Sequence, residues 1–188
     1  MAKFTETPRL SFDFTDALEF AHRKHWKQIR KDEKQTPYIA HLLAVSSLVL
    51  EADGDEIAAI AALLHDVLED TSCTVVELEE KFGAAVSAVV QQLSENKSLE
   101  KAERKLAYAK SVLEISDRAV LVSLADKLHN LRGIAGGQAP ELITEVNKVF
   151  YLELIRNLGA RIPGMGRTAM SQLSELRGLW QQVWKEEI

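Results

Sequence analysis

Apolar residues recur with helical spacing along most of this chain. Between residues 14 and 28 they fall at Phe14, Ala17, Leu18 and Ala21, which share one face of a helix. The same rhythm predicts further helices over residues 38–52, 57–68, 84–93, 99–115, 119–132, 141–158 and 168–185. No run of five or more residues alternates as a strand does outside these helical contexts. The pattern therefore predicts an all-α fold, a single bundle of about 8–10 helices.

Short polar or glycine-containing segments separate the predicted helices. Residues 30–36 are polar and predict a loop, and the Asp53-Gly54-Asp55 sequence predicts a tight turn. Thr74 and Glu77 match a capping box, which predicts a short helix that ends at Gly83. Residues 159–166 are the candidate for a looser junction before the final helix, which carries Trp180 and Trp184 at i and i+4. That aromatic stripe fits either packing on the core or a dimer contact.

Composition narrows the class of protein. A chain of 188 residues with 46% hydrophobic and 27% charged residues fits one globular domain, here residues 1–188. The single cysteine, Cys73, excludes an intrachain disulfide and suits the cytoplasm. We expect no signal peptide and no membrane span, because no apolar run is long enough. The net charge of −5 argues against nucleic acid as a partner, and the oligomeric state stays open.

Polar residues interrupt three of the most apolar predicted helices. His65 and Asp66 lie within ALLHDVLEDT, His41 follows an apolar helix start, and Asp126 interrupts AVLVSLADKLHNL. One such pair alone is also consistent with a helix end that has reached solvent. Unpaired polar groups inside an apolar helix are costly, so these residues are natural partners for one another or for a cation. Two imidazoles and two carboxylates suit six-coordinate Mn²⁺ or Fe²⁺ better than a closed Zn²⁺ site.

The order and surroundings of these residues resemble the H…HD…D pattern of the HD superfamily. Four segments resemble signatures of its Rel/Spo-type alarmone hydrolase domain, including small single-domain alarmone hydrolases: RKDEKQTPYIAH, AALLHDVLEDT, FGAAV and LADKLHNLR. The resemblance covers residues 17–132, with the C-terminal helices at 141–187 outside it. It implies an all-helical fold with one Mn²⁺ ion, held by His41, His65, Asp66 and Asp126. It also implies hydrolysis of the 3′-pyrophosphate of (p)ppGpp, giving GDP or GTP and pyrophosphate.

Three further residues are predicted to take part in catalysis. Glu69 lies four residues after His65, so a continuous helix places it on the metal side, and Asp70 follows it. A solvated helix end is the alternative, but a carboxylate beside a metal can orient the attacking water. The resemblance assigns the Glu69-Asp70 pair to catalysis and makes Asn130, four residues after Asp126, an active-site polar group. We expect His129 to be a packing residue or to contact a ligand residue.

Positive charge gathers ahead of the first metal-binding histidine. Five basic residues occur within nine positions, namely Arg23, Lys24, Lys27, Arg30 and Lys31. They form either a solvated face or a collar for a polyanionic nucleotide. The resemblance favours Arg30 and Lys31 as substrate contacts, with Tyr38 stacking on or bonding to the nucleotide. The phosphate-binding candidates further along the chain are Lys97 and Arg104.

Other functions remain open at this point. The position before Leu124 is often lysine in the family and is Ser123 here, and the chain after Arg132 resembles the family only in helical content. The choice between guanine and adenine is therefore unsettled. The alternatives are a (p)ppApp hydrolase, a broader HD-type nucleotide phosphohydrolase, or a non-catalytic module that senses a nucleotide.

Overall fold

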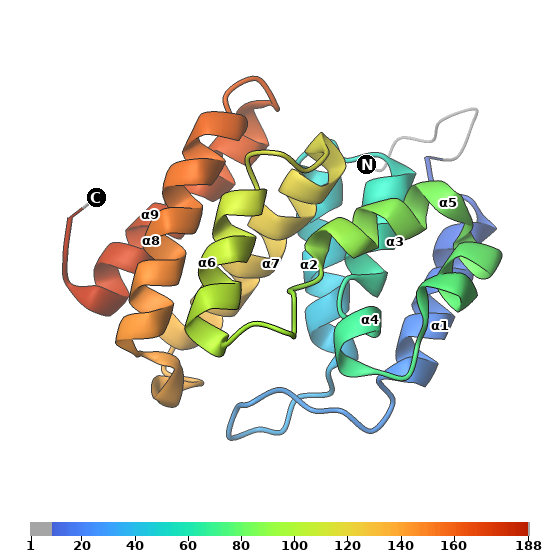
Figure 1. The fold of residues 1–188 in the computed structure, drawn as a ribbon, viewed down its shortest axis with the longest axis horizontal. Coiled ribbons are helices and arrows are strands. Elements are labelled where there is room, and N and C mark those ends of the chain that lie inside the picture. The colour runs from blue at the N-terminus through green and yellow to red at the C-terminus, as the bar shows by residue number, and fades with distance from the viewer. Residues whose placement is uncertain (1–8, 188) are drawn as a thin grey trace, which may run out of the picture.

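The computed structural model describes residues 9–187, and its regular elements are helices (Figure 1). The prediction of an all-α fold is confirmed. Within residues 9–187 the β pairing amounts to an isolated bridge between Ile29 and Pro37. The elements in chain order are α1 (Phe12–Lys24), α2 (Ile39–Glu51), α3 (Glu56–Leu64), α4 (Val67–Asp70), α5 (Val75–Leu93), α6 (Lys101–Ser111), α7 (Asp117–Ala135), the 3₁₀ turn η1 (Pro140–Leu142), α8 (Glu145–Arg161) and α9 (Arg167–Trp184).

Helix α3 lies at the centre of one half of the bundle. It packs against α1, α2, α5 and α7, and every residue from Ala58 to Leu64 is buried. Four alanines in this run leave room for close approach of the neighbouring helices, and the Ser46 hydroxyl of α2 donates to the Ala59 carbonyl oxygen at 3.0 Å. A helix that is apolar on all sides is stable only when it is enclosed, so α3 provides a rigid base for the residues at its end.

The other half of the bundle is built on α7. This helix contacts α2 and α3 on one side and α8 and α9 on the other, while α6 packs against α8. Figure 1 shows α8 and α9 at one end of the molecule and α1 and α5 at the other. Trp180 is 1% exposed, and its ring centroid lies 5.8 Å from that of Trp184. The aromatic stripe of the last helix therefore packs on the core of this chain.

Several predicted helix boundaries need correction. The first helix ends at Lys24 rather than at residue 28, and α6 ends at Ser111 rather than at residue 115. The helix predicted over residues 57–68 is interrupted after Leu64, and α4 begins at Val67. The interruption lies at His65 and Asp66, where the chain turns before the Asp66 carbonyl accepts the amide of Asp70 at 2.9 Å. The helix predicted from residue 141 begins instead at Glu145, because Thr144 caps it by accepting the amide of Asn147.

The glycine positions agree with the sequence pattern. Gly83 has φ +81° and interrupts α5, as the predicted helix end required. At Gly54 a Cβ atom would lie 2.8 Å from the Val49 carbonyl oxygen, so only glycine fits this turn without movement.

In the part of the chain that the structure describes, no helix has the length and apolar character needed to cross a membrane.

Candidate metal centre

Three helices bring the predicted metal ligands together. His41 lies on α2, His65 at the end of α3 and Asp126 in the middle of α7, and one ligand atom of each lies within 4.8 Å of the others. The Asp126 Oδ1 atom is 3.2 Å from His41 Nε2 and 3.6 Å from His65 Nε2. The Asp66 Oδ2 atom is 3.1 Å from His65 Nε2 and 3.7 Å from His41 Nε2. The fold therefore gathers all four side chains at one point.

The outer nitrogens of the two imidazoles already have partners. The Nδ1 atom of His65 lies 2.8 Å from the Ala62 carbonyl oxygen, which only a protonated Nδ1 can satisfy. Its Nε2 atom is buried and has no hydrogen-bond partner among the described residues. The Nδ1 atom of His41 lies 2.9 Å from His129 Nδ1, which leaves its Nε2 atom facing Asp126. Bonding of the outer ring nitrogen is the usual way to orient a metal-binding histidine, so this arrangement fits a divalent cation.

The charges of the gathered side chains also favour a bound cation. Burial lowers the pKa of His41. Burial opposes protonation of His65 too, but the carboxylates of Asp66 and Asp126 outweigh it and raise its pKa well above the usual value. Burial acts to raise the pKa of Asp126, whereas Lys127 and the two histidines hold that pKa well below its usual value. Ionised carboxylates next to buried imidazoles favour a positive charge between them.

Asp126 is fixed by two further side chains of α7. Lys127 Nζ donates to its Oδ2 atom at 2.5 Å, and Asn130 Nδ2 donates to its Oδ1 atom at 2.6 Å. Arg30 Nη2 in turn donates to Asn130 Oδ1 at 2.7 Å. Arg30 and Asn130, predicted as a substrate contact and a catalytic residue, thus form one chain of hydrogen bonds to a predicted metal ligand. Lys127 was not predicted, although its charge within an apolar helix was a signal.

Asp66 is held by the phenol of Tyr38. The Tyr38 hydroxyl donates to Asp66 Oδ2 at 2.6 Å, and its ring stacks on buried His25 with centroids 5.1 Å apart. His25 Nδ1 lies 2.7 Å from Gln28 Oε1, and Gln28 Nε2 donates to the Asp70 carbonyl oxygen at 2.7 Å. Tyr38, predicted to contact the nucleotide, therefore also holds a predicted metal ligand in place, and His25 packs against Tyr38 as a structural residue.

Glu69 and Asp70 flank the centre on different sides. The restart of the helix at α4 keeps Glu69 beside the metal ligands despite the interruption, and its Oε1 atom accepts the Glu95 amide at 2.8 Å. A small polar pocket of about 100 Å³ is lined by Glu69 together with the ligand residues His65, Asp66 and Asp126. Asp70 instead lines a larger neighbouring space. Burial raises the pKa of Glu69, and burial together with Asp66 raises the pKa of Asp70, so both are stronger bases than free carboxylates.

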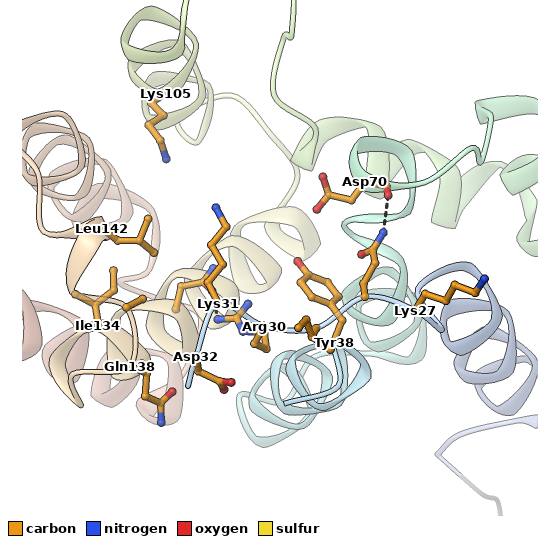
Figure 2. A pocket seen from close by; sticks show the side chains of 15 residues that line it. Lys27, Arg30, Lys31, Asp32, Tyr38, Asp70, Lys105, Ile134, Gln138 and Leu142 are labelled. Atoms are coloured by element: carbon orange, nitrogen blue, oxygen red, sulfur yellow. Dashed lines mark hydrogen bonds between the residues drawn. The ribbon is translucent and has the colours of Figure 1, made fainter. Parts of the chain in front are cut away.

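The larger space, called the large cavity here, has a volume of about 760 Å³ (Figure 2) and shares Tyr38 and Asn130 with the small polar pocket. Five of the predicted site residues line it, namely Arg30, Lys31, Tyr38, Asp70 and Asn130. Lys105, Gln138 and Leu142 also line it, and no sequence pattern had marked them. The lining mixes apolar side chains with polar and cationic ones, which suits a ligand with a ring system and negative charges.

The remaining basic candidates lie apart from the large cavity. Lys97 is exposed and donates to the Glu69 carbonyl oxygen, and Arg104 pairs with Glu95 at 2.9 Å. The five basic residues before Tyr38 fall into two groups with different surroundings. Arg23 and Lys24 pair with acidic residues, whereas Lys27, Arg30 and Lys31 line the large cavity. The substrate roles of Lys97 and Arg104 stay predictions.

Known proteins with the same organisation were found by sequence and by structure. A family model described as HD domain matches residues 17–159. The human protein named guanosine-3′,5′-bis(diphosphate) 3′-pyrophosphohydrolase MESH1 is 38% identical over 169 residues, which are 87% of this chain and 94% of that protein. Its namesake in Drosophila melanogaster is 44% identical over 126 residues, 66% of this chain and 70% of that protein.

Solved structures agree with the sequence matches. A structure described as a metazoan ortholog of SpoT that hydrolyses ppGpp and plays a role in starvation responses superposes with a TM-score of 0.79 at 36% identity, covering 93% of this chain and 99% of that one. The protein lmo0812 from Listeria monocytogenes superposes with a TM-score of 0.71 at 26% identity, covering 80% of this chain and 97% of that one. The family match, the human relative and the gathered ligand residues lead to one conclusion. This chain belongs to the HD domain family.

Proposed function

We propose that this protein hydrolyses the 3′-diphosphate of guanosine 3′,5′-bis(diphosphate) with the help of one divalent metal ion. The observation that carries the proposal is that the small polar pocket, lined by three of the predicted ligand residues, shares Tyr38 and Asn130 with the large cavity, which Arg30 and Lys31 also line. The relatives named for this reaction support the same substrate. A cavity of about 760 Å³ is within the size range of sites that enclose a nucleotide-sized ligand.

The metal ion would be held by His41, His65, Asp66 and Asp126. When bound, such an ion neutralises phosphate charge and makes water a better nucleophile near neutral pH. We propose Mn²⁺, because a mixed set of imidazoles and carboxylates suits it. Such an ion would give the Nε2 atom of His65 the partner that it lacks and would balance the charge of the facing carboxylates.

The two acidic residues after the ligand pair have separate tasks in this proposal. Water attacks the phosphorus atom bonded to ribose O3′, the P–O3′ bond breaks with O3′ as the leaving group, and the diphosphate is released with the oxygen of the water. Glu69 lines the small polar pocket with the ligand residues and accepts the proton of the attacking water. Asp70 lines the large cavity and returns a proton to O3′. The raised pKa of each carboxyl group suits proton exchange.

Neighbouring side chains keep the ligand residues and the nucleotide in position. Asn130 donates a hydrogen bond to Asp126 and accepts one from Arg30. Binding of a nucleotide phosphate to Arg30 would therefore alter the hydrogen bonds that position Asp126. Lys31 is exposed at the rim of the large cavity, where its ammonium group can bind the same phosphate.

The proposed location is the cytoplasm, which suits the single, buried Cys73.

A panel of nucleotides tests the proposal. The purified protein with Mn²⁺ is incubated with ppGpp, ppApp and simple 5′-monophosphates, and the products are separated by ion exchange. We expect GDP and pyrophosphate from ppGpp. Cleavage of ppApp alone would change the base assignment, and cleavage of 5′-monophosphates alone would replace the proposal with a broader nucleotidase. Binding of ppGpp without any turnover would indicate a nucleotide sensor.

A further inference from the structure

A second basic cavity adjoins both the small polar pocket and the large cavity. This lysine cavity has a volume of about 380 Å³, and its basic lining residues are Lys31, Lys101, Arg104, Lys105 and Lys127. It shares Glu69 and Lys127 with the small polar pocket and shares Lys31 and Lys105 with the large cavity. Asn130 lines all three spaces, so a ligand that spans the large cavity and the small polar pocket lies next to the lysine cavity.

Two of the five basic groups in the lysine cavity are already neutralised. Arg104 pairs with Glu95 at 2.9 Å, and Lys127 pairs with Asp126 at 2.5 Å. Within residues 9–187, Lys31, Lys101 and Lys105 form no ion pair with a carboxylate. Glu69 also lines the cavity, so three lysines without an ion pair face one carboxylate, and the cavity carries an excess of positive charge.

Lys105 differs from the other two because it is not freely solvated. Its Nζ atom lies 4.4 Å from the centroid of the buried Phe150 ring, which packs from α8 against α6. Burial, together with the charge of Lys127, lowers the pKa of Lys105 to about 8. Figure 2 shows Lys105 reaching from α6 and Lys31 reaching from the loop toward the same part of the large cavity. A half-buried ammonium without a counter-ion is stabilised when an anion binds.

We propose that Lys105 binds a phosphate group of the substrate other than the one at the metal. The proposal rests on the proposed function, because it requires a substrate with more than one phosphate group. Two groups have this chemistry: the 5′-phosphate chain and the outer phosphate of the 3′-diphosphate. Lys105 is held by Phe150 at the junction of two cavities, so it anchors the anion while the metal and Glu69 act on the scissile bond.

The test uses charge-removing and charge-keeping variants of the Mn²⁺-loaded protein. Lys105→Gln removes the charge, Lys105→Arg keeps it, and Lys110→Gln is the matched control on an exposed position of the same helix. We expect Lys105→Gln to raise KM for ppGpp about tenfold, the scale of one lost charge-assisted hydrogen bond, with kcat nearly unchanged. Lys105→Arg should recover most of the affinity, and Lys110→Gln should behave as the unmodified protein. An unchanged KM in Lys105→Gln overturns the proposal, as does an equal change in Lys110→Gln.

Guanosine 3′-diphosphate without 5′ phosphates identifies the group that is bound. If the effect of Lys105→Gln disappears with this substrate, Lys105 binds the 5′ chain, and if it persists, Lys105 binds the outer phosphate of the 3′ arm. If the unmodified protein cleaves neither nucleotide, the proposed function fails. The binding of inorganic pyrophosphate, measured by calorimetry, then decides on Lys105. Weaker binding by Lys105→Gln than by Lys110→Gln supports the phosphate site, and equal binding overturns it.

Discussion

Replacing Tyr38 with phenylalanine separates two roles for this residue. The substitution removes the hydroxyl that donates to Asp66 Oδ2 at 2.6 Å and keeps the ring that stacks on His25. A hydrogen bond to a charged group contributes about 1.5–3 kcal/mol, which corresponds to roughly 10- to 100-fold in an equilibrium constant. We therefore expect Tyr38→Phe to weaken Mn²⁺ binding by roughly 10- to 100-fold, the usual scale for a group that orients a metal ligand.

The measurement is a Mn²⁺ titration followed by electron paramagnetic resonance, which requires no substrate. Tyr108→Phe is the matched control, because it also removes a buried hydroxyl, but one that donates to Ser123 at 2.9 Å rather than to a carboxylate. Its Mn²⁺ affinity should change less than that of Tyr38→Phe. If Tyr38→Phe binds Mn²⁺ as tightly as the unmodified protein while KM for ppGpp rises, the tyrosine acts on the nucleotide, and the support of Asp66 is refuted.

Three further predictions concern the metal ion, the Glu69-Asp70 pair and the N-terminal cap of α3. Exhaustive chelation should abolish hydrolysis, with Mn²⁺ the best ion to restore it; full activity after chelation would contradict a metal requirement. Glu69→Gln and Asp70→Asn should keep Mn²⁺ binding while turnover falls roughly 10²-fold or more, as expected for proton-transfer groups; loss of the metal in either variant would show that the residue is a ligand. Asp55→Ala should lower the free energy of unfolding by about 1 kcal/mol in urea denaturation at pH 7, because Asp55 caps α3 by accepting the Ala58 amide. The hydrogen bond from Arg118 lowers the pKa of Asp55, so this difference should be present above the unfolded pKa of about 3.9 and be lost as pH falls through the lower folded value; equal stability of the two proteins at pH 7 would contradict the cap.

The helices and the residues that gather at the candidate metal centre were predictable because both leave local signals. Helical apolar spacing marked the bundle, and polar residues such as His65 and Asp126 stood out against apolar neighbours. Lys105 left no such signal, since it lies in the strongly charged segment KAERKLAYAKS. Its partial burial comes from packing against Phe150 of α8, a contact between residues far apart in the sequence.

The interruption of the central helix was missed for a similar reason. The ALLHDVLEDT segment has continuous helical spacing, so local propensity alone predicts a single helix. The turn at His65 and Asp66 is accompanied by tertiary contacts, namely the bond from Tyr38 to Asp66 and the contact of His65 with Asp126. The sequence pattern marked His65 and Asp66 as unusual polar residues. The break in the helix at these residues goes with contacts to distant parts of the chain, which the pattern does not contain.

The origin of the ligand residues in α2, α3 and α7 has a consequence for the order of folding. His41 and Asp126 come from helices that are distant along the chain, so each can form its own helix before the two side chains meet. Bringing the two helices together closes a long loop, and the loss of chain entropy is not offset by contacts within each helix. High-affinity uptake of the ion must therefore wait until α7 has docked on α2 and α3. The rate of Mn²⁺ capture during refolding should report the docking of these helices rather than their formation.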